Sequence, residues 1–182
     1  LTRDGNNGAK AGNINEALKF LHGDYLLVLD ADFLVHPEAI ERLVKPMWNQ
    51  DIAIVQAPQE FYNPDPVQRS LGIGEHASND QGHFFNSILQ ARNNGNAAFF
   101  CGTCALIRST ALKKLGGLPI ESITEDIFLT LKLKSLGMET VTITEPVAIG
   151  LAAESFDGLF TQRRRWGQGA MQMNFSLWWG SG

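Results

Sequence analysis

The sequence predicts an α/β fold with a mostly parallel sheet flanked by helices, and two observations support this class. Residues 25–29 form an apolar run of the kind that makes a strand buried on both faces at the centre of a parallel sheet. A helical pattern at 37–48 and a second short apolar run at 52–56 follow it. Strand, helix and strand in this order form a βαβ unit, in which the two strands run parallel.

Size and composition limit the possible functions. With 182 residues, 44% of them hydrophobic and 19% charged, the chain is one domain large enough to bury a core. Its net charge of -4 argues against a nucleic-acid partner, and no stretch is apolar enough to cross a bilayer. Because Leu1 is not an initiator residue, we expect the chain to be an excerpt of a longer protein.

Two carboxylates follow the first apolar run, with one small residue between them. Side chains alternate along an extended chain, so Asp30 and Asp32 are predicted to point the same way where the strand leaves the sheet. Ligands of open α/β sheets bind at such ends, and hard oxygen donors there suit Mg²⁺ or Mn²⁺ carrying a phosphorylated substrate. Solvated loop acids are the alternative interpretation.

A cation precedes the first predicted helix. Residues 1–12 have the composition of a loop that contains Lys10, and residues 11–21 have helical spacing with Asn13 as a candidate N-cap. A lysine at a helix N-terminus opposes the helix dipole unless an anion such as a diphosphate is shared between them. An exposed surface lysine is the alternative.

Prolines and a weak pattern mark the middle of the chain. Pro46 is predicted to kink or end the helix at 37–48, and three prolines exclude a central strand from residues 57–66. Residues 67–96 are predicted to be mostly helical, with an interruption near residues 79–82.

The two cysteines form one Cys-x-x-Cys pair, Cys101 and Cys104. They lie in residues 97–107, whose pattern predicts a strand or a strand followed by a turn. Zinc would need two further ligands, which no second cysteine pair supplies, and a redox pair is expected to open a helix. A packing or substrate-shaping role is therefore favoured over a redox role.

An acidic helix start follows a short predicted helix at 109–115. Thr124 is predicted to be the N-cap of a helix that extends to residue 136, with Glu125 and Asp126 in its first turn. Helix capping alone would account for these residues. Residues 139–144 alternate and are rich in β-branched side chains, which predicts a further strand.

The last segment, residues 156–179, combines arginines with aromatic side chains and contains Gln162-Arg-Arg-Arg-Trp166. A guanidinium group matches phosphate and an indole is a platform for a sugar ring, so Arg165 beside Trp166 indicates a ligand site. An exposed basic patch is the common alternative. The methionines and aromatic residues at 171–179 suit burial or a membrane interface.

The motifs stand in a fixed order: Lys10-Ala-Gly-Asn13, Asp30-Ala-Asp32, Phe100-Cys-Gly-Thr103, Thr124-Glu-Asp126 and Gln162-Arg-Arg-Arg-Trp166. With Phe61-Tyr-Asn-Pro-Asp-Pro66 and Gly150-Leu-Ala-Ala-Glu154, the chain resembles, over essentially its whole length, the processive family 2 glycosyltransferases with a GT-A (Rossmann-like) fold. Within them it is most similar to bacterial cellulose synthase catalytic subunits. Synthases of β-1,3-glucan, mannan, chitin or hyaluronan are the alternative, since Gln-Arg-Arg-Arg-Trp is shared with chitin synthases.

The resemblance implies a role for each motif. Asp126 would be the general base, with Glu125 beside it. Asp32 and Asp30 would hold Mg²⁺ or Mn²⁺. The residues implied at the donor diphosphate are Lys10, Asp30, Asp32, Gln162 and Arg165. Those implied at the acceptor sugar are Phe100, Cys101, Gly102, Thr103 and Trp166.

The resemblance also implies the reaction and its surroundings. The reaction would be an inverting, metal-dependent transfer of a sugar, glucose from UDP-glucose, onto the end of a growing β-glucan. In the full-length protein it would take place at the cytoplasmic face of the bacterial inner membrane. The family's sheet begins upstream of Leu1, so residues 1–182 would be a partial catalytic domain with its N-terminal strands missing and an incomplete uridine site. Residues 155–179 would be a helical segment at the membrane interface, and the isolated fragment could be inactive.

Two other classes of protein compete with this interpretation. Haloacid-dehalogenase-like phosphatases also begin with an apolar strand and Asp-x-Asp, where the first aspartate is a nucleophile. They place Thr or Val where this chain has Leu34, and they do not explain residues 162–166. A non-catalytic carbohydrate-binding module is disfavoured because every catalytic residue expected in this segment is present.

Overall fold

The computed structural model describes residues 8–74, 77, 79–120 and 124–179. Its strands are β1 (Tyr25–Val28), β2 (Leu34–Val35), β3 (Ile52–Gln56), β4 (Glu60–Phe61), β5 (Ala105–Arg108), β6 (Glu139–Thr142) and β7 (Ala148–Gly150). Its α-helices are α1 (Ala9–Leu18), α2 (Ala39–Val44), α3 (Pro66–Leu71), α4 (Asp80–His83), α5 (Ser109–Leu115), α6 (Glu125–Ser135) and α7 (Phe156–Trp179). The 3₁₀-helices η1 (Lys45–Trp48) and η3 (Arg92–Gly95) and the π-helix η2 (Phe84–Leu89) complete the described elements.

The predicted α/β class is confirmed, with one strand running against the others. The larger sheet has the order β1-β5-β3-β6, and β5 pairs antiparallel with both β1 and β3, while β3 and β6 are parallel. Strands β1, β3 and β6 therefore run in one direction. The prediction that β1 lies at the sheet centre is wrong for the described chain, where β5 pairs with only one edge of it. Its side chains do face both cores, Leu26 and Val28 on one side and Tyr25 and Leu27 on the other, although three of its four residues are only half-buried.

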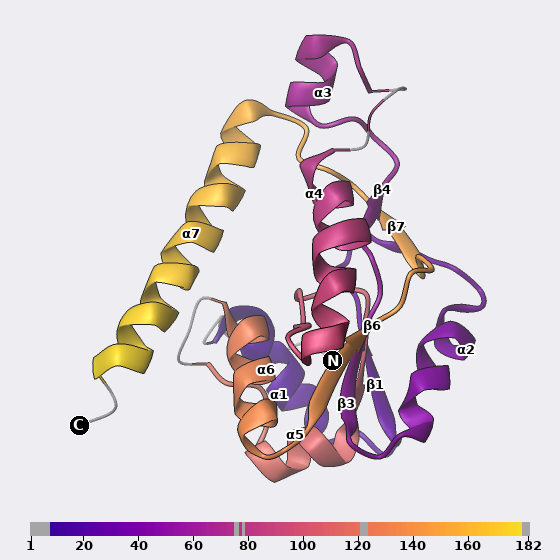
Figure 1. The fold of residues 1–182 in the computed structure, drawn as a ribbon, viewed down its shortest axis with the longest axis vertical. Helices are drawn as coiled ribbons and strands as arrows, with labels where there is room; N and C mark the ends of the chain where they lie inside the picture. The colour runs from indigo at the N-terminus through magenta and orange to yellow at the C-terminus, as the bar shows by residue number, and fades with distance from the viewer. Residues whose placement is uncertain (1–7, 75–76, 78, 121–123, 180–182) are drawn as a thin grey trace.

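Helices cover both faces of this sheet, as Figure 1 shows. Helices α1, α5 and α6 pack on one face, over the side chains of Ile54 and Ile107. Helix α2 and η1 pack on the other face, over Val55 and Leu106. The alternation along β3 and β5 sends successive apolar side chains into the two cores, which is why all four side chains are almost fully buried.

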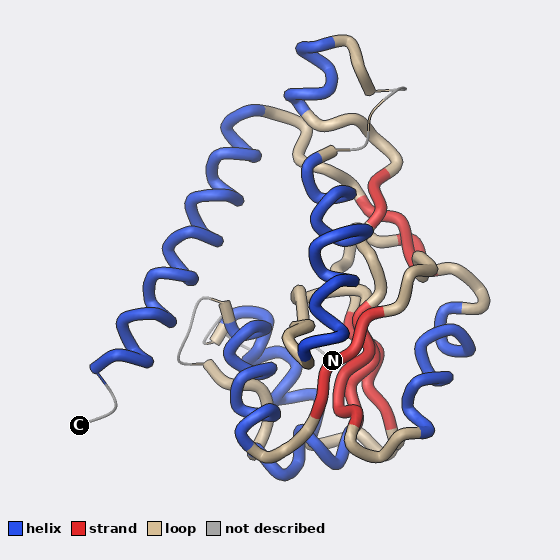
Figure 2. The backbone as a smooth tube through the Cα atoms, viewed as in Figure 1, coloured by secondary structure: helices blue, strands red, loops and turns tan. Residues whose placement is uncertain are grey.

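A second sheet of three very short strands, in the order β2-β7-β4, was not predicted (Figure 2). It holds Phe33 against Phe61, whose ring centroids lie 6.0 Å apart in an edge-to-face arrangement. Gly150 in β7 allows this packing, because a Cβ there would lie 2.5 Å from the Phe33 ring. The small sheet thus fixes two aromatic side chains just beyond the Asp-x-Asp turn.

Most predicted helices are confirmed, and the first needs a correction. Helix α1 begins at Ala9 with Gly8 at the N-cap, so Asn13 lies inside the helix and Lys10 in its first turn. Gly8 takes a left-handed conformation with φ of 73°, which a glycine adopts without strain. Pro46 does end α2, which tightens into η1, and Thr124 stands at the N-cap of α6, although its side chain makes no capping hydrogen bond.

Helix α7 is long and lies beside the rest of the molecule in Figure 1. Its N-terminal end contacts α3, because Arg69 in α3 donates a hydrogen bond to the carbonyl oxygen of Glu154, which lies just before α7. Further along, Gly169 lies so close to Thr124 that a Cβ would fall 2.2 Å from the threonine Cγ2. Within the described residues, no helix has the length and apolar character to span a membrane.

Candidate active site

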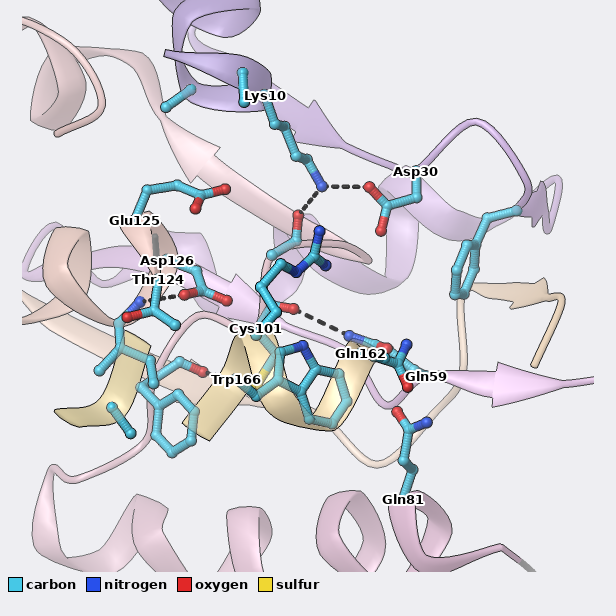
Figure 3. Close-up of a pocket in the computed structure, with 18 of the residues that line it drawn as sticks. Lys10, Asp30, Gln59, Gln81, Cys101, Thr124, Glu125, Asp126, Gln162 and Trp166 are labelled. Carbon is cyan, nitrogen blue, oxygen red and sulfur yellow. Dashed lines mark hydrogen bonds and ion pairs between the residues drawn. The ribbon is translucent and has the colours of Figure 1, made fainter. Parts of the chain in front are cut away.

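One cleft of about 900 Å³ gathers residues from distant parts of the chain. It is lined by the start of α1, the Asp-x-Asp turn after β1, the loop before β5, the start of α6 and one side of α7. The predicted site residues that line it are Lys10, Asp30, Asp32, Cys101, Gly102, Glu125, Asp126, Gln162, Arg165 and Trp166. Figure 3 shows several of these side chains converging from opposite walls.

Lys10 connects two of the predicted motifs. Its ammonium forms an ion pair with Oδ1 of Asp30 and donates to the carbonyl oxygen of Gly102 at 2.5 Å (Figure 3). The first turn of α1 therefore carries its cation to the point where the Asp-x-Asp turn meets the loop of residues 101–104. This arrangement satisfies the ammonium without a bound ligand, and an anionic ligand entering the cleft would meet it.

The loop of residues 101–104 is a tight turn rather than part of a strand. Gly102 has φ of 87° and Cys104 has φ of 55°, so two residues of four adopt the left-handed conformation. A Cβ at Gly102 would lie 3.3 Å from Oδ2 of Asp126. Because Gly102 has no side chain, the space next to the Asp126 carboxylate on this side stays free.

Asp126 has the electrostatic character of a general base. It lies half-buried in the first turn of α6, where Oδ1 accepts a 2.8 Å hydrogen bond from the backbone N–H of Ile127. Burial, with a smaller contribution from the charge of Glu125, raises its pKa from 3.8 to about 6. A carboxylate with this pKa is ionised at neutral pH and still basic enough to accept a proton.

Helix α7 brings Gln162, Arg165 and Trp166 to the opposite wall. The guanidinium of Arg163 lies over the indole of Trp166, 4.6 Å from the ring centroid. Among the described residues, Oε1 of Gln162 is a buried side-chain oxygen without a hydrogen-bond partner. A buried acceptor left unpaired is costly, and a hydroxyl or N–H of a bound ligand would satisfy it.

Two residues predicted at the acceptor do not line the cleft. The side chain of Phe100 is 1% exposed and packs in the core with α6, because its backbone N–H is tied to Oγ1 of Thr130. Thr103 is 2% exposed, and its Oγ1 accepts from the backbone N–H of Asp30 at 2.8 Å. Both residues therefore stabilise the loop through hydrogen bonds and do not face the space that a ligand would occupy.

The two thiols are held in the protonated form. Burial raises the pKa of Cys101 well above its ordinary value and that of Cys104 to about 12. The nucleophilic and redox-active form is the thiolate, which these environments disfavour. This agrees with the packing or substrate-shaping role predicted for the pair.

The donor set suits a divalent cation that arrives with a phosphate. Asp30 and Asp32 both line the cleft directly after β1, and Asp32 is exposed. The described residues contain no cluster of three or more His, Cys, Asp or Glu side chains that would make a complete metal cage. Mg²⁺ commonly takes only one or two protein carboxylates and completes its shell with water and substrate phosphate, so the two aspartates fit this kind of site.

Several side chains that line the cleft were not predicted to belong to the site. Gln59 donates from Nε2 to the carbonyl oxygen of Cys101 at 3.1 Å (Figure 3), and Gln81 is almost fully buried beside it. The aromatic members of this set are Phe33, Phe61, Phe84, Phe85 and Phe99. Polar and aromatic residues scattered through loops and very short elements give no periodic signal, so only the fold brings them together.

Comparison with known proteins agrees with these features. The family model described as Glycosyltransferase like family 2 matches residues 1–169. The UDP-forming cellulose synthase catalytic subunit of Xanthomonas axonopodis pv. citri is 39% identical over 95% of this chain and 24% of its own length. The corresponding subunit of Pseudomonas fluorescens is 38% identical over the same shares. The chain thus spans about a quarter of the length of these relatives.

Solved structures support the fold. A mannosyltransferase from Pyrobaculum calidifontis, in complex with GDP-Man and Mn²⁺, has a TM-score of 0.68 at 21% identity and covers 100% of this chain with 46% of its own. Glucosyl-3-phosphoglycerate synthase from Mycobacterium tuberculosis, with Mn²⁺ and UDP-glucose, has a TM-score of 0.52 at 18% identity. That match covers 90% of this chain and 52% of the synthase.

Proposed function

The chain belongs to the family described as Glycosyltransferase like family 2, and from this premise we propose that it carries the catalytic centre of a cellulose synthase-like enzyme. The reaction is an inverting, metal-dependent transfer of glucose from UDP-glucose to the end of a growing β-glucan. Family membership favours glycosyl transfer over the phosphatase interpretation. The similarity to cellulose synthase catalytic subunits supports this choice of donor and polymer.

The observation that carries the proposal is the pairing of a base with cations across one cleft. Asp126, with its pKa raised to about 6, lines the same cleft as Lys10 and Arg165. Transfer from a nucleotide sugar needs a group that accepts the acceptor's proton and groups that offset the charge of the departing diphosphate. This cleft offers both.

On the donor side, Lys10 and Arg165 contact the diphosphate oxygens, the ammonium as a point charge and the guanidinium as a fork. Asp30 and Asp32 would hold Mg²⁺ or Mn²⁺, which when bound supplies further positive charge at the leaving group. Gln162 presents its unpaired buried oxygen to a hydroxyl or N–H of the ligand.

On the acceptor side, Asp126 accepts the proton of the acceptor hydroxyl while that oxygen forms a bond to C1 of the donor sugar. The bond from C1 to the phosphate oxygen breaks, and the diphosphate leaves as the nucleotide. Attack from the opposite face turns an α-linked donor into a β-linked product. Glu125 lies beside the base and helps to raise its pKa, while Trp166 offers its indole as a platform for the terminal sugar.

The surroundings of the reaction are part of the proposal. The full-length protein works at the cytoplasmic face of the bacterial inner membrane, with the growing polysaccharide as acceptor and with residues 155–179 at the membrane interface. Synthesis of a β-1,3-glucan, mannan, chitin or hyaluronan by the same centre is the alternative, because the motif of residues 162–166 is shared with chitin synthases.

A donor screen of the full-length protein tests this proposal. UDP-glucose, UDP-N-acetylglucosamine and GDP-mannose are supplied separately, and the linkage of any polymer is analysed. We expect polymer from UDP-glucose alone, with β linkages, and its loss in Asp126→Asn with UDP binding kept. Asp51→Asn, at an exposed position outside the cleft, is the matched control. Polymer with α linkages, or turnover of phosphate esters in place of transfer, would contradict the proposal.

A further inference from the structure

The loop of residues 101–104 has an unusual backbone conformation that needs hydrogen-bond partners outside the loop. Two of its residues have positive φ, and the loop lies between the Lys10 ammonium and the Asp126 carboxylate. A turn of this kind does not satisfy its own backbone groups as a helix or strand does, so each needs an outside partner. One buried side chain supplies two of these partners, one near each end of the turn.

That side chain is Gln56, the last residue of β3. It is 0% exposed, although glutamine is seldom fully buried. Its Nε2 donates to the carbonyl oxygen of Thr103 at 2.8 Å and to that of its neighbour Ala57 at 2.7 Å. Its Oε1 accepts from the backbone N–H of Cys101 at 2.9 Å. The carboxamide therefore forms hydrogen bonds with the backbone near both ends of the turn.

The same turn also contacts other parts of the centre. Gly102 accepts the Lys10 ammonium through its carbonyl oxygen, and the hydroxyl of Thr103 accepts the N–H of Asp30. A shift of the turn would therefore move the backbone that faces the Asp126 carboxylate. The carboxamide of Gln56 contacts none of the reacting groups and acts on them only through the loop.

We propose that Gln56 is a positioning residue that holds the loop of residues 101–104 in register between the general base and the donor site, and so sets where the acceptor hydroxyl stands. This role rests on the proposed function. It follows from the full burial of the carboxamide, its hydrogen bonds to both ends of the turn, and the placement of the turn against Lys10 and Asp126.

The test replaces Gln56 in the full-length protein and separates binding from transfer. Gln56→Met keeps the length of the side chain and removes both kinds of hydrogen bond. A misplacement of reacting groups by about 1 Å can cost on the order of 100-fold in rate, so we expect kcat to fall by about that factor. UDP affinity by calorimetry should stay within about twofold, because the ion pair of Lys10 with Asp30 does not involve Gln56 or the turn.

A second readout does not depend on transfer. Loosening the turn should expose the half-buried thiol of Cys101, and its alkylation, followed by mass spectrometry of that peptide, should be about tenfold faster in Gln56→Met. The matched control is Asn93→Leu, which removes a similar carboxamide clamp on the backbone of Thr142, outside the cleft. We expect wild-type kcat and wild-type alkylation of Cys101 in that control.

Gln56→Glu adds a graded test. A protonated carboxyl can still donate to one carbonyl and accept from the Cys101 N–H, whereas a carboxylate would face the carbonyl oxygens of Thr103 and Ala57. The ratio of its kcat to that of the wild type should therefore fall as pH rises, while the ratio for Gln56→Met stays flat.

The outcomes separate the two proposals. Wild-type kcat and alkylation in Gln56→Met, or parallel losses of UDP affinity and kcat, would overturn the positioning role. A wild-type protein that transfers no sugar would instead overturn the proposed function. In that case the alkylation of Cys101 still decides whether Gln56 holds the turn.

Discussion

Replacing the general base should stabilise the protein while it destroys the activity. Asp126 has its pKa raised from 3.8 to about 6, chiefly by burial, so the native state holds this carboxyl in its charged form at a cost. A difference of roughly two pKa units corresponds to about 3 kcal/mol at a pH above both values. Asp126→Asn removes the charge but keeps an oxygen that can accept the 2.8 Å hydrogen bond of the Ile127 N–H.

The sign of the pH dependence follows from proton binding. Between pH 4 and pH 6 the native state holds the proton more tightly than the unfolded state, so the stability of the wild type is lost as pH rises through this window. Below about pH 4 both states are protonated and the cost is absent. We therefore expect Asp126→Asn to be more stable than the wild type by about 1 to 3 kcal/mol at pH 8 and by almost nothing at pH 3.5.

Chemical denaturation of the purified chain at the two pH values measures this difference, with the exposed Asp51→Asn as the control. The same carboxyl predicts that kcat/KM of the full-length wild type rises with pH through an apparent pKa near 6, because only the ionised form accepts the acceptor's proton. A variant that is less stable than the wild type at pH 8, or equally shifted at both pH values, would refute this account of Asp126.

Two further predictions concern glycines and have matched controls within the chain. Gly102→Ala should lower kcat by at least about tenfold and leave UDP affinity unchanged, because its methyl would lie 3.3 Å from the general-base carboxylate at φ of 87°. Gly72→Ala shares the positive φ but has nothing within 4 Å, so an equal loss in both variants would refute the reasoning. Gly169→Ala should displace α7, since its Cβ would fall 2.2 Å from Thr124, and should weaken both transfer and UDP binding. Gly167→Ala, with nothing within 4 Å, should instead stabilise the same helix by roughly 0.5–1 kcal/mol, measured by chemical denaturation. Steady-state kinetics and binding calorimetry should show transfer and UDP affinity lowered in Gly169→Ala and unchanged in Gly167→Ala.

Local patterns were sufficient to predict the parts of the site that depend on neighbours in sequence. The acids after β1 and the acidic first turn of α6 follow from an apolar run that ends in charge and from a capping pattern. The start of α1 was placed too late, because the polar residues near Asn13 resemble a cap while the actual cap is a glycine with positive φ. Because residues 1–12 contain several glycines typical of a loop, nothing in the sequence distinguished Gly8 as the N-cap.

Long-range pairing could not be predicted in the same way. Nothing in residues 105–108 indicates that β5 runs antiparallel between β1 and β3, and strands of two or three residues such as β2 and β4 give no periodic signal. Gln56 is another case, since a glutamine at the end of an apolar run looks like the point where a strand reaches solvent. Its full burial depends on a turn 45 residues later in the chain, to which its Oε1 is bonded.

The charge of the cleft itself argues for a cation. The charged side chains among the described residues that line it are Lys10, Asp30, Asp32, Glu125, Asp126 and Arg165. Four acids and two bases leave a surplus of two negative charges, and a diphosphate adds more of the same sign. Like charges within a few ångströms repel one another even in a partly solvent-exposed cleft, so the two bases alone do not make a diphosphate site.

A divalent ion would reverse this balance, and that gives a prediction with opposite signs in two conditions. Without Mg²⁺ or Mn²⁺, Asp32→Asn in the full-length protein should bind UDP more tightly than the wild type, because one repelling charge is gone. With the metal present it should bind UDP more weakly, by about tenfold, because a ligand of the ion is gone. Glu125 is not assigned as a metal ligand. Glu125→Gln should therefore bind UDP more tightly without the metal and should not lose UDP affinity when the metal is present. If calorimetry shows that Asp32→Asn changes UDP affinity in the same direction in both conditions, Asp32 does not hold the ion.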